Sequence, residues 1–453
     1  MAITELMFLN HSSVIIRHQD EYLICDPWFE KPAFGSWLPT FGMYVHPMYI
    51  ASLEDKLKIL ISHAHDDHCD DHLLQLFHRD TAIISSDFAS QSVKRRLKKL
   101  GFDNYIPVDK DGIKINSFSI TSIRNDEISQ DDALYLIRTP EALVIHSNDN
   151  WFKMESYQIE LIKSEIDKVG RERTIFMSQT NSASGYPLNY VNYSREEKKQ
   201  LLQDKVKGMI STGLQNAVSV GAAYFHSYAG YASVFVKGKQ DYLDNSLFPT
   251  PRMIKKELSN IIPAEIEILD LYPGDTFDFS SVKKSFFQGS YTDEQIRAYS
   301  TKYYLAYGQE KQCDSYKDIS QILDDEQIEK ELSLFLQAFN EFVIQKVKTD
   351  NFHNSVIGKK LAISIPEIEV SVGLQFGKGL ITEGEFNKEI LVSPNVISQM
   401  LKGEILFENL YTGYNAEFKR NPKHIYNRDI IMYMGMFSYI YQNRIAPKLN
   451  AVK

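Results

Sequence analysis

Four residues that commonly bind metal ions lie close together in the sequence: His63, His65, Asp67 and His68. They follow a short apolar run, 59–61, and offer more metal-binding capacity than a surface loop needs for solubility. Neutral imidazoles together with carboxylates suit zinc, iron or manganese better than calcium or magnesium. We therefore predict a metal site at this cluster. The alternative is that these histidines only cap a helix.

The spacing within the cluster suggests more than one metal ion. His63 and His65 are two residues apart, so on an extended segment their side chains point to the same side. Asp67 and His68 follow on a turn and can face a neighbouring position. We expect the histidines to bind one metal ion and Asp67 with His68 to bind a second. The cluster would then be half of a two-metal site.

The cluster must be positioned by the elements on either side of it. A β-prone run, 56–62, ends at the first histidine, and a helical pattern, 72–77, follows the last, so the cluster occupies a strand-to-helix loop. Strands and helices interleave along the first half of the chain, which predicts α/β layers with sheet at the centre. The other strands are expected at 7–9, 14–16, 22–25, 82–85, 113–120, 134–137, 142–146 and 222–226, and the helices at 91–100, 155–169 and 195–217.

The C-terminal part has a different pattern. Prolines and weak periodicity follow residue 242, and a long helix is then expected at 320–347. Three strands, at 361–365, 369–376 and 390–392, and a helix at 395–401 are expected after it. A chain of 453 residues exceeds the size at which one core stops growing, so more than one structural unit is expected. We predict a metal-binding core at 1–240, an irregular connection at 241–318 and an α+β extension packed on the core at 319–453.

Charge and composition exclude several classes of protein. The 50 basic and 59 acidic residues give a net charge of −9, which argues against sequence-independent binding of nucleic acid. The densest basic run, 94–99, is typical of the solvated face of a helix. The three cysteines form no disulfide framework, no apolar run approaches the roughly 18 residues of a membrane helix, and the first residues lack a signal-peptide pattern. We expect a cytoplasmic protein that does not enter a membrane.

The cluster at 63–68, placed directly after an apolar strand, resembles the signature of the metallo-β-lactamase superfamily. The resemblance implies an αβ/βα sandwich with metal ions between two sheets. Asp149 lies where that superfamily keeps a bridging aspartate, and His226 is the candidate for its last histidine ligand. A buried core histidine is an equal alternative for His226. His146 could be a ligand, a hydrogen-bond partner of a ligand, or a satisfied polar residue.

A closer resemblance is to the metallo-β-lactamase-like part of CMP-N-acetylneuraminate hydroxylase. It rests on short segments that keep that family's order along nearly the whole chain. The Rieske iron–sulfur domain associated with that hydroxylase is not evident, because the three cysteines form no pair of Cys-x-His and Cys-x-x-His motifs. Any electrons would then come from a separate electron-donor protein. Beside the histidine cluster, the segments are Cys25-Asp26-Pro27-Trp28 with 32–34, Ala183-Ser184-Gly185-Tyr186-Pro187, Tyr228-Ala229-Gly230-Tyr231, and Leu410-Tyr411-Thr412-Gly413 leading to Arg420 and Pro422.

The chain departs from the superfamily at the ligand between the cluster and Asp149, which is usually a histidine. The stretch 124–132 contains no histidine but is acidic. A carboxylate, Glu127 or Asp126, is the expected substitute, and a solvated acidic turn is the alternative. A carboxylate here resembles the diiron oxygenases of the superfamily, such as the β-hydroxylase of the chloramphenicol pathway. Oxygen-rich ligation favours iron over zinc, with manganese also compatible.

Other residues are candidates for the wall of a substrate pocket, although aromatic residues at this density are also ordinary core residues. Arg420, Lys423 and Arg428 could meet an anion or form a solvated face. The pocket candidates are His11, Trp28, His146, Tyr186 and Tyr228.

These observations predict a metal-dependent enzyme with two divalent metal ions. The favoured function is a diiron oxygenase that hydroxylates a polar small molecule, such as a nucleotide sugar or an amino-acid-derived metabolite. The alternative is a zinc hydrolase acting on a phosphodiester, lactone or amide, in which Asp67 or Asp149 orients a hydroxide. A third possibility is a non-catalytic binding protein on the same fold. The sequence is compatible with a monomer or a homodimer.

Overall fold

The computed structural model forms two compact units, residues 1–183 with 203–312, and residues 184–202 with 313–453. These units divide the chain at places different from the boundaries predicted at 240 and 318. The residues whose structure is described are 4–29, 32–39, 45–124, 131–150, 153–181, 184–234, 249–259, 265–285, 292, 294–295, 298, 302, 323–349, 354–425 and 428–442.

The first unit contains two large mixed sheets. In the first, the strands from β3 to β7 run parallel, whereas β1, β2, β16 and β17 pair in antiparallel fashion. Its order is β17 (Val282–Lys283), β16 (Thr276–Phe277), β1 (Thr4–Asn10), β2 (Ser13–His18), β3 (Glu21–Cys25), β5 (Leu57–Leu60), β6 (Ile83–Ser86) and β7 (Tyr105–Val108).

The second sheet is parallel on one side and antiparallel on the other. Its order is β15 (Glu267–Leu269), β13 (Tyr224–Tyr228), β12 (Thr174–Gln179), β11 (Leu143–His146), β10 (Ala133–Arg138), β9 (Phe118–Arg124) and β8 (Ile113–Ile115). A small separate ladder joins β4 (Trp37–Pro39) to β14 (Ala232–Val234).

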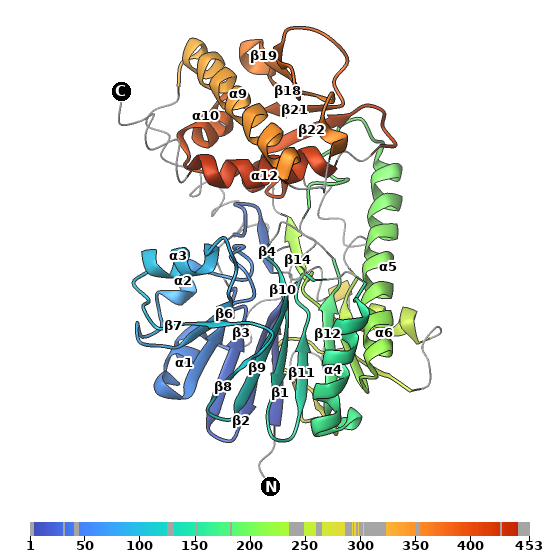
Figure 1. Cartoon of the computed structure of the whole chain (residues 1–453). Coiled ribbons are helices and arrows are strands. Elements are labelled where there is room, and N and C mark those ends of the chain that lie inside the picture. Colours follow the sequence, from blue (N-terminus) through green and yellow to red (C-terminus); the bar gives the residue numbers. More distant parts are fainter. Residues whose placement is uncertain are drawn as a thin grey trace. The chain divides into compact units, whose positions relative to one another are not determined.

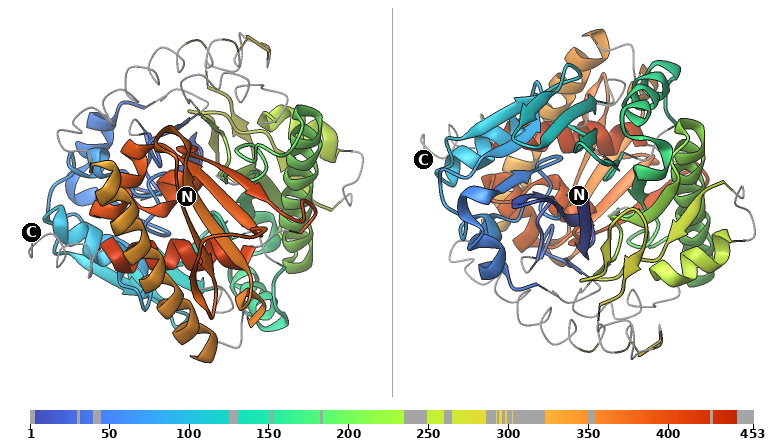
Figure 2. Two further views of the ribbon diagram at one scale, coloured as in Figure 1. Left: turned by 90° about the horizontal axis from the view of Figure 1, so that it is seen from above. Right: turned by 90° about the horizontal axis from the view of Figure 1, so that it is seen from below.

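Helices cover the outer face of each sheet (Figures 1 and 2). On the first sheet, the apolar residues of α1 (Pro47–Ala51), α2 (Asp71–Leu74) and α3 (Ser92–Lys99) pack with strand residues in one buried cluster. On the second, α4 (Ser156–Val169) lies on β10 and β11, and α6 (Pro251–Leu258) lies on β13 and β15. The inner faces of the two sheets meet, and the Tyr135 hydroxyl donates to the Ser62 carbonyl at 3.0 Å across them. This confirms the predicted αβ/βα sandwich.

One predicted strand is wrong. The run 113–120 was expected to be a single strand, but it forms the whole of one hairpin strand, β8, and the start of the next, β9. Asn116 lies between them with a φ of 52°, a left-handed conformation that asparagine tolerates better than most residues. Because the apolar residues continue across the turn, hydrophobicity alone does not reveal it.

Helix α5 (Arg195–Val220) begins in the second unit and ends in the first. Its Gly213 is buried against β12, where a Cβ atom would lie 2.4 Å from the Ser178 Oγ. We expect Gly213→Ala to lower the free energy of unfolding by about 1–3 kcal/mol, because neither backbone can move freely in the packed layer. Urea unfolding followed by circular dichroism measures the change.

The same helix provides the control. Gly208 is exposed, and a Cβ atom there would meet nothing within 4 Å. Gly208→Ala should therefore stabilise the protein by about 0.5–1 kcal/mol, since alanine loses less backbone entropy in a helix. If Gly213→Ala and Gly208→Ala both stabilise the protein, the inference that Gly213 packs closely against Ser178 is wrong.

The second unit has one five-stranded sheet with helices and its own apolar core. The residues 189–191 also belong to this unit, and a β-bridge joins Tyr190 to Phe418. The strand order is β20 (Gly379–Ile381), β19 (Val370–Gln375), β18 (Lys360–Ile365), β21 (Lys388–Val392) and β22 (Ala416–Arg420), and the helices are α9 (Asp325–Thr349), α10 (Pro394–Lys402), α11 (Phe407–Tyr411) and α12 (Arg428–Ile440). The predicted C-terminal α+β composition is confirmed.

Within the described part of the chain, none of the helices combines the length and the apolar character needed to cross a membrane.

Candidate metal centre

The histidine cluster occupies the loop between β5 and α2, as the sequence predicts. The loop is held in place by Asp26, which follows β3 and is completely buried. One carboxylate oxygen of Asp26 accepts a hydrogen bond from the Ser62 backbone N–H at 2.7 Å. The other accepts from the Ser62 hydroxyl at 2.7 Å and from His68 Nδ1 at 2.8 Å. Asp26 therefore fixes both the start of the loop and the ring of its last histidine.

The hydrogen bonds to Asp26 orient His68 toward other potential ligands. Because Nδ1 donates to Asp26, Nε2 is the nitrogen that can bind a metal ion. It lies 3.4 Å from the Asp149 Oδ1 and 3.8 Å from the Asp67 Oδ2, and it makes no hydrogen bond with the described residues. The side chain of His68 is fully buried. A buried nitrogen facing two carboxylates is suited to binding a cation placed between them.

Two groups of potential ligands converge here, and His68 belongs to both. One consists of His11, Asp67 and His68, and the other of His63, His68 and Asp149; within each group the ligand atoms lie within 4.8 Å of one another. The His11 Nε2 lies 3.4 Å from the Asp67 Oδ2. Both ring nitrogens of His11 and the Asp67 Oδ1 are buried without a hydrogen bond in the described structure. Unsatisfied buried polar atoms are costly, so this set fits bound metal ions.

His63 and His65 face each other, with the His63 Nε2 2.7 Å from the His65 Nδ1. His63 is buried, whereas His65 is exposed. The Ser62 hydroxyl lies 3.0 Å from the His63 Nδ1 and orients its ring. The expected pairing of these two histidines on one side of the loop is therefore present in the structure. His65 does not belong to either of the two converging groups among the described residues.

The electrostatics of the site favour positive charge at its centre. Burial lowers the pKa of His68, but the carboxylates of Asp149, Asp26 and Asp67 outweigh burial and raise that pKa well above its usual value. For His63, burial and the positive charges of His68 and His65 lower the pKa well below its usual value. His63 is then a neutral imidazole, the form that binds metals.

Asp149 is held by residues at the ends of two strands of the second sheet, Gln179 at the end of β12 and Asn148 after β11. The Gln179 side-chain amide donates to the Asp149 Oδ1 at 2.9 Å, and the Asn148 side-chain oxygen accepts from the Asp149 backbone N–H at 2.7 Å. Asn148 has a φ of 41°, and His11 and Asp26 also take left-handed backbone conformations, with φ of 40° and 43°. Such conformations are unfavourable for residues other than glycine and cluster at functional sites.

His146 contacts Asp26 and Tyr228 and is not a member of either converging group among the described residues. Its Nε2 lies 3.0 Å from the Asp26 Oδ2, and the Tyr228 hydroxyl lies 2.6 Å from its Nδ1. Tyr228 in turn accepts a hydrogen bond from the Asn148 backbone N–H at 2.9 Å. Since both ring nitrogens of His146 have protein partners, the structure favours the role of hydrogen-bond partner among the three roles considered for it.

The remaining predicted residues lie in varied surroundings. His226 is buried, with its Nδ1 3.1 Å from the Leu269 carbonyl and its ring 5.2 Å from that of Phe8. Burial lowers its pKa to about 4. His226 does not belong to a converging group in the described structure.

Trp28 is buried against His11, with ring centroids 5.0 Å apart. Glu127 and Asp126 lie outside the described residues, and Tyr186 belongs to the second unit.

Three residues important to the site were not predicted as such. Asp26 directly follows a buried strand, which is a position where sites are often built. Arg96 lies in the basic run assigned to a solvated helix face, yet it donates to the Ala64 carbonyl at 2.6 Å and to Asp66 at 2.8 Å. Asp132, from the acidic stretch 124–132, is buried, and burial together with the charge of Asp149 raises its pKa well above the usual value.

Comparison with known proteins agrees with this geometry. Residues 5–183 match the family described as Beta-lactamase superfamily domain. The predicted resemblance to the metallo-β-lactamase superfamily is therefore confirmed, and the domain includes the whole histidine cluster and Asp149.

Curated relatives of the chain come from mycobacteria. A protein of Mycobacterium tuberculosis (strain H37Rv) named "Putative Rieske 2Fe-2S iron-sulfur protein" is 22% identical over 329 residues, which are 66% of this chain and 58% of that protein. A protein of the same name from Mycolicibacterium smegmatis is 23% identical over 289 residues, 60% of this chain and 53% of that protein. The chain thus spans somewhat more than half the length of these relatives.

Solved structures similar to this chain include a possible metal-dependent hydrolase from Veillonella parvula, with a TM-score of 0.42 and 11% identity over 61% of this chain and 99% of that chain. They also include CmlA, a diiron β-hydroxylase from Streptomyces venezuelae, with a TM-score of 0.40 and 13% identity over 61% of this chain and 54% of that chain.

Proposed function

We propose that this protein is an oxygenase that uses two iron ions to activate dioxygen and hydroxylate a polar small molecule. The observation that carries the proposal is the convergence of buried ligand atoms on His68. These atoms come from loops of both sheets, and two groups of them share His68. Suitable substrates include a nucleotide sugar or an amino-acid-derived metabolite.

The chemistry of the ligand set supports iron. Asp67 and Asp149 contribute oxygen atoms at the centre, and Asp132 is a further buried carboxyl group within electrostatic range of Asp149. Oxygen-rich ligation with imidazoles suits iron or manganese, whereas sites built mainly from histidine and cysteine suit zinc. If Glu127 is the missing middle ligand, it adds a further carboxylate to the set.

The names of the mycobacterial relatives also support iron chemistry, since both are called Rieske iron–sulfur proteins. A Rieske cluster needs two cysteines and two histidines in close pairs. Cys25 and Cys69 are instead buried and separate, and the cysteines of this sequence form no such pair. We propose that a separate electron-donor protein supplies the electrons.

Bound iron would supply the redox chemistry of dioxygen activation. His11, His63, Asp67, His68 and Asp149 would hold the metal ions. Asp26 fixes the His68 ring, and Gln179 fixes the Asp149 carboxylate. Because His68 and Asp67 are buried, the protein limits the access of water to the reacting centre.

Metal analysis of protein purified without added metal tests the proposal. We expect about two iron ions per chain and an optical spectrum that changes when the reduced protein meets oxygen. A variant with both His63→Ala and Asp149→Ala is the control, and it should lose about half of the iron, because both residues belong to the same converging group.

Other results would lead to different functions. Stoichiometric zinc without iron, together with cleavage of phosphodiester or lactone probes, would overturn the oxygenase in favour of a hydrolase. Full metal content in the double variant would show that the metal binds elsewhere. A folded protein that retains no metal would support a binding protein on the same fold.

A further inference from the structure

We propose that the exposed basic face of helix α3 binds a small acidic iron–sulfur protein, which delivers electrons to the metal centre. The inference rests on the proposed oxygenase, because an enzyme that only hydrolyses its substrate needs no electrons. The basic face consists of four exposed cationic residues, Lys94, Arg95, Lys98 and Lys99. It lies in the first unit, which also contains the candidate metal centre.

The contacts of Arg96 place helix α3 beside the loop between β5 and α2, which carries the histidine cluster. The Arg96 Nη1 donates to the carbonyl of Ala64 at 2.6 Å, and Ala64 lies between His63 and His65 in the sequence. The Arg96 Nη2 donates to the Asp66 carboxylate at 2.8 Å. A protein bound to the basic face therefore lies next to the loop that carries the proposed metal ligands.

The same loop reaches the protein surface at His65. This histidine is exposed, and its Nδ1 lies 2.7 Å from the Nε2 of the buried His63. Its ring packs edge-on against Phe34, whose backbone N–H donates to Asp66 at 3.2 Å. Since Asp66 also pairs with Arg96, His65 lies close to α3. An electron that enters at His65 has one hydrogen bond to cross before it reaches a proposed metal ligand.

The charges within α3 disfavour the helix unless a partner compensates them. The helix contains no acidic residue, and it carries two like-charge pairs four residues apart, Lys94 with Lys98 and Arg95 with Lys99. Such pairs destabilise a helix. Cations in the last turn interact favourably with the helix dipole, which accounts for Lys98 and Lys99 but not for Lys94 and Arg95. A negatively charged partner would interact favourably with all four residues.

The basic face also differs in sign from the protein as a whole. The chain has a net charge of −9. The exposed acidic residues nearest to α3 in the sequence are Asp87 and Asp103, so between them the exposed cations outnumber the exposed acids. A concentrated positive patch steers an acidic protein to one orientation, whereas the negative charge elsewhere repels it. Charge complementarity therefore selects the α3 side of the first unit.

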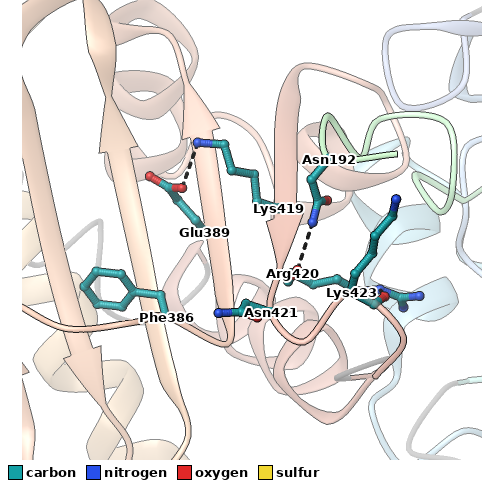
Figure 3. Close-up of a pocket in the computed structure, with 7 residues that line it drawn as sticks. All are labelled: Asn192, Phe386, Glu389, Lys419, Arg420, Asn421 and Lys423. Carbon is teal, nitrogen blue, oxygen red and sulfur yellow. Dashed lines mark hydrogen bonds and ion pairs between the residues drawn. The ribbon is translucent and has the colours of Figure 1, made fainter. Parts of the chain in front are cut away.

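A second group of basic residues, in the second unit, is less suited to such a partner. Lys419, Arg420 and Lys423 belong to the lining of a cavity of about 320 Å³ (Figure 3). The Lys419 Nζ lies 3.0 Å from the carboxylate of Glu389, and the Lys423 Nζ lies 2.7 Å from that of Glu197. Arg420 is buried. The positive charge of this group is thus paired or enclosed.

The chemistry of hydroxylation determines what the partner must carry. Dioxygen places one oxygen atom in the substrate and releases the other as water, which requires two electrons and two protons from elsewhere. An iron–sulfur protein with one [2Fe–2S] cluster gives one electron at each encounter and is itself oxidised, so two encounters are needed. Complexes of this kind must form and separate quickly, and a small charged interface has that property.

Isothermal titration calorimetry with a plant-type [2Fe–2S] ferredoxin, which is small and acidic, tests the surface. The oxidised ferredoxin is titrated into the full chain, so the measurement needs no reaction. We expect binding at low ionic strength that weakens as salt is added, because the Debye length falls from about 10 Å at 0.1 M to about 3 Å at 1 M. Absence of binding at low ionic strength would overturn the proposal.

Charge reversal locates the complex. A variant with both Arg95→Glu and Lys99→Glu should weaken ferredoxin binding about tenfold, because two attractions become repulsions. The matched control carries Lys163→Glu and Lys207→Glu, at exposed positions of α4 and α5, and should change the affinity less than about twofold. Equal weakening in the two double variants would overturn the proposal, because the attraction would then follow the overall charge alone.

The fold and the selectivity of the surface are checked separately. All four substituted residues are exposed, so circular dichroism and the melting temperature should show that both double variants fold. A single-stranded oligonucleotide is titrated in place of ferredoxin. If it binds as tightly as ferredoxin and loses affinity in the α3 variant, the proposal is overturned, because the basic face would then bind any polyanion.

Metal content and chemical reduction distinguish this test from that of the oxygenase. Both should be the same in the wild type and the two double variants, because none of the substituted residues is a proposed ligand. Iron that dithionite reduces, with ferredoxin binding unchanged by charge reversal on α3, would overturn the surface and leave the oxygenase in place. Zinc without iron would overturn the oxygenase and the delivery of electrons with it, even if ferredoxin binds.

Discussion

Asp26→Ala is expected to lower the free energy of unfolding by about 3–5 kcal/mol, the cost of breaking a buried ionic network by removing one partner. The carboxylate accepts hydrogen bonds from Ser62, His68 and His146 in a fully buried position. Burial alone would raise the pKa of Asp26, but the charge of His68 and the hydrogen bonds from both histidines lower it far below its usual range. Urea unfolding at neutral pH measures the loss.

Asp26→Asn separates stability from metal binding. Asparagine has nearly the same shape and tolerates the left-handed backbone at this position, so the fold should survive. The negative charge that orients His68 is lost, and metal affinity should fall about 10–100-fold. Asp20→Asn, at an exposed position, should leave both quantities unchanged. Normal metal affinity in Asp26→Asn would rule out an orienting role for the carboxylate.

His68→Ala should remove nearly all bound metal, whereas His11→Ala and His63→Ala should each remove about half. The difference follows from the geometry, because His68 belongs to both converging groups and each of the other two belongs to one. Elemental analysis of the purified variants, expressed as metal ions per folded chain, gives the numbers directly. If two metal ions are bound, the wild type should contain about two per chain and the single-group variants about one.

The matched control for these variants is His78→Ala, since the His78 side chain is 72% exposed. It should retain the wild-type metal content. Metal loss of the same size in His11→Ala, His63→Ala and His68→Ala would contradict two separate positions and indicate a single metal ion. Circular dichroism of each variant distinguishes loss of a ligand from loss of the fold.

Sequence reasoning placed the cluster correctly on its strand-to-helix loop. The signals were local: an apolar run that ends at His63, a helical pattern after it, and spacing within a few residues. The order of the layers followed from the resemblance that the cluster itself suggested. These features depend on neighbours in the chain, so they can be deduced from the sequence.

The surroundings of the cluster could not be deduced in the same way. Arg96 appeared to belong to a solvated helix face because its neighbours Lys94, Arg95, Lys98 and Lys99 are indeed exposed. Its contacts with Asp66 and Ala64 depend on how α3 packs beside the loop. Asp26 and His11 come from separate strand ends, and no periodicity relates them to Asp67 or His68. Contacts of this kind are set by the packing of the two sheets.

The proposed ligands come from loops on both sheets, and this has a thermodynamic consequence. Asp67 and His68 follow a strand of the first sheet, and Asp149 follows a strand of the second. The site is complete only when the sheets are stacked, so metal binds the native state in preference to the unfolded one. Free metal at 100 times its dissociation constant would then add about 2.7 kcal/mol to the unfolding free energy. Removal of the metal by a chelator should therefore lower the melting temperature of this protein, and this effect can be measured without an assay of its activity.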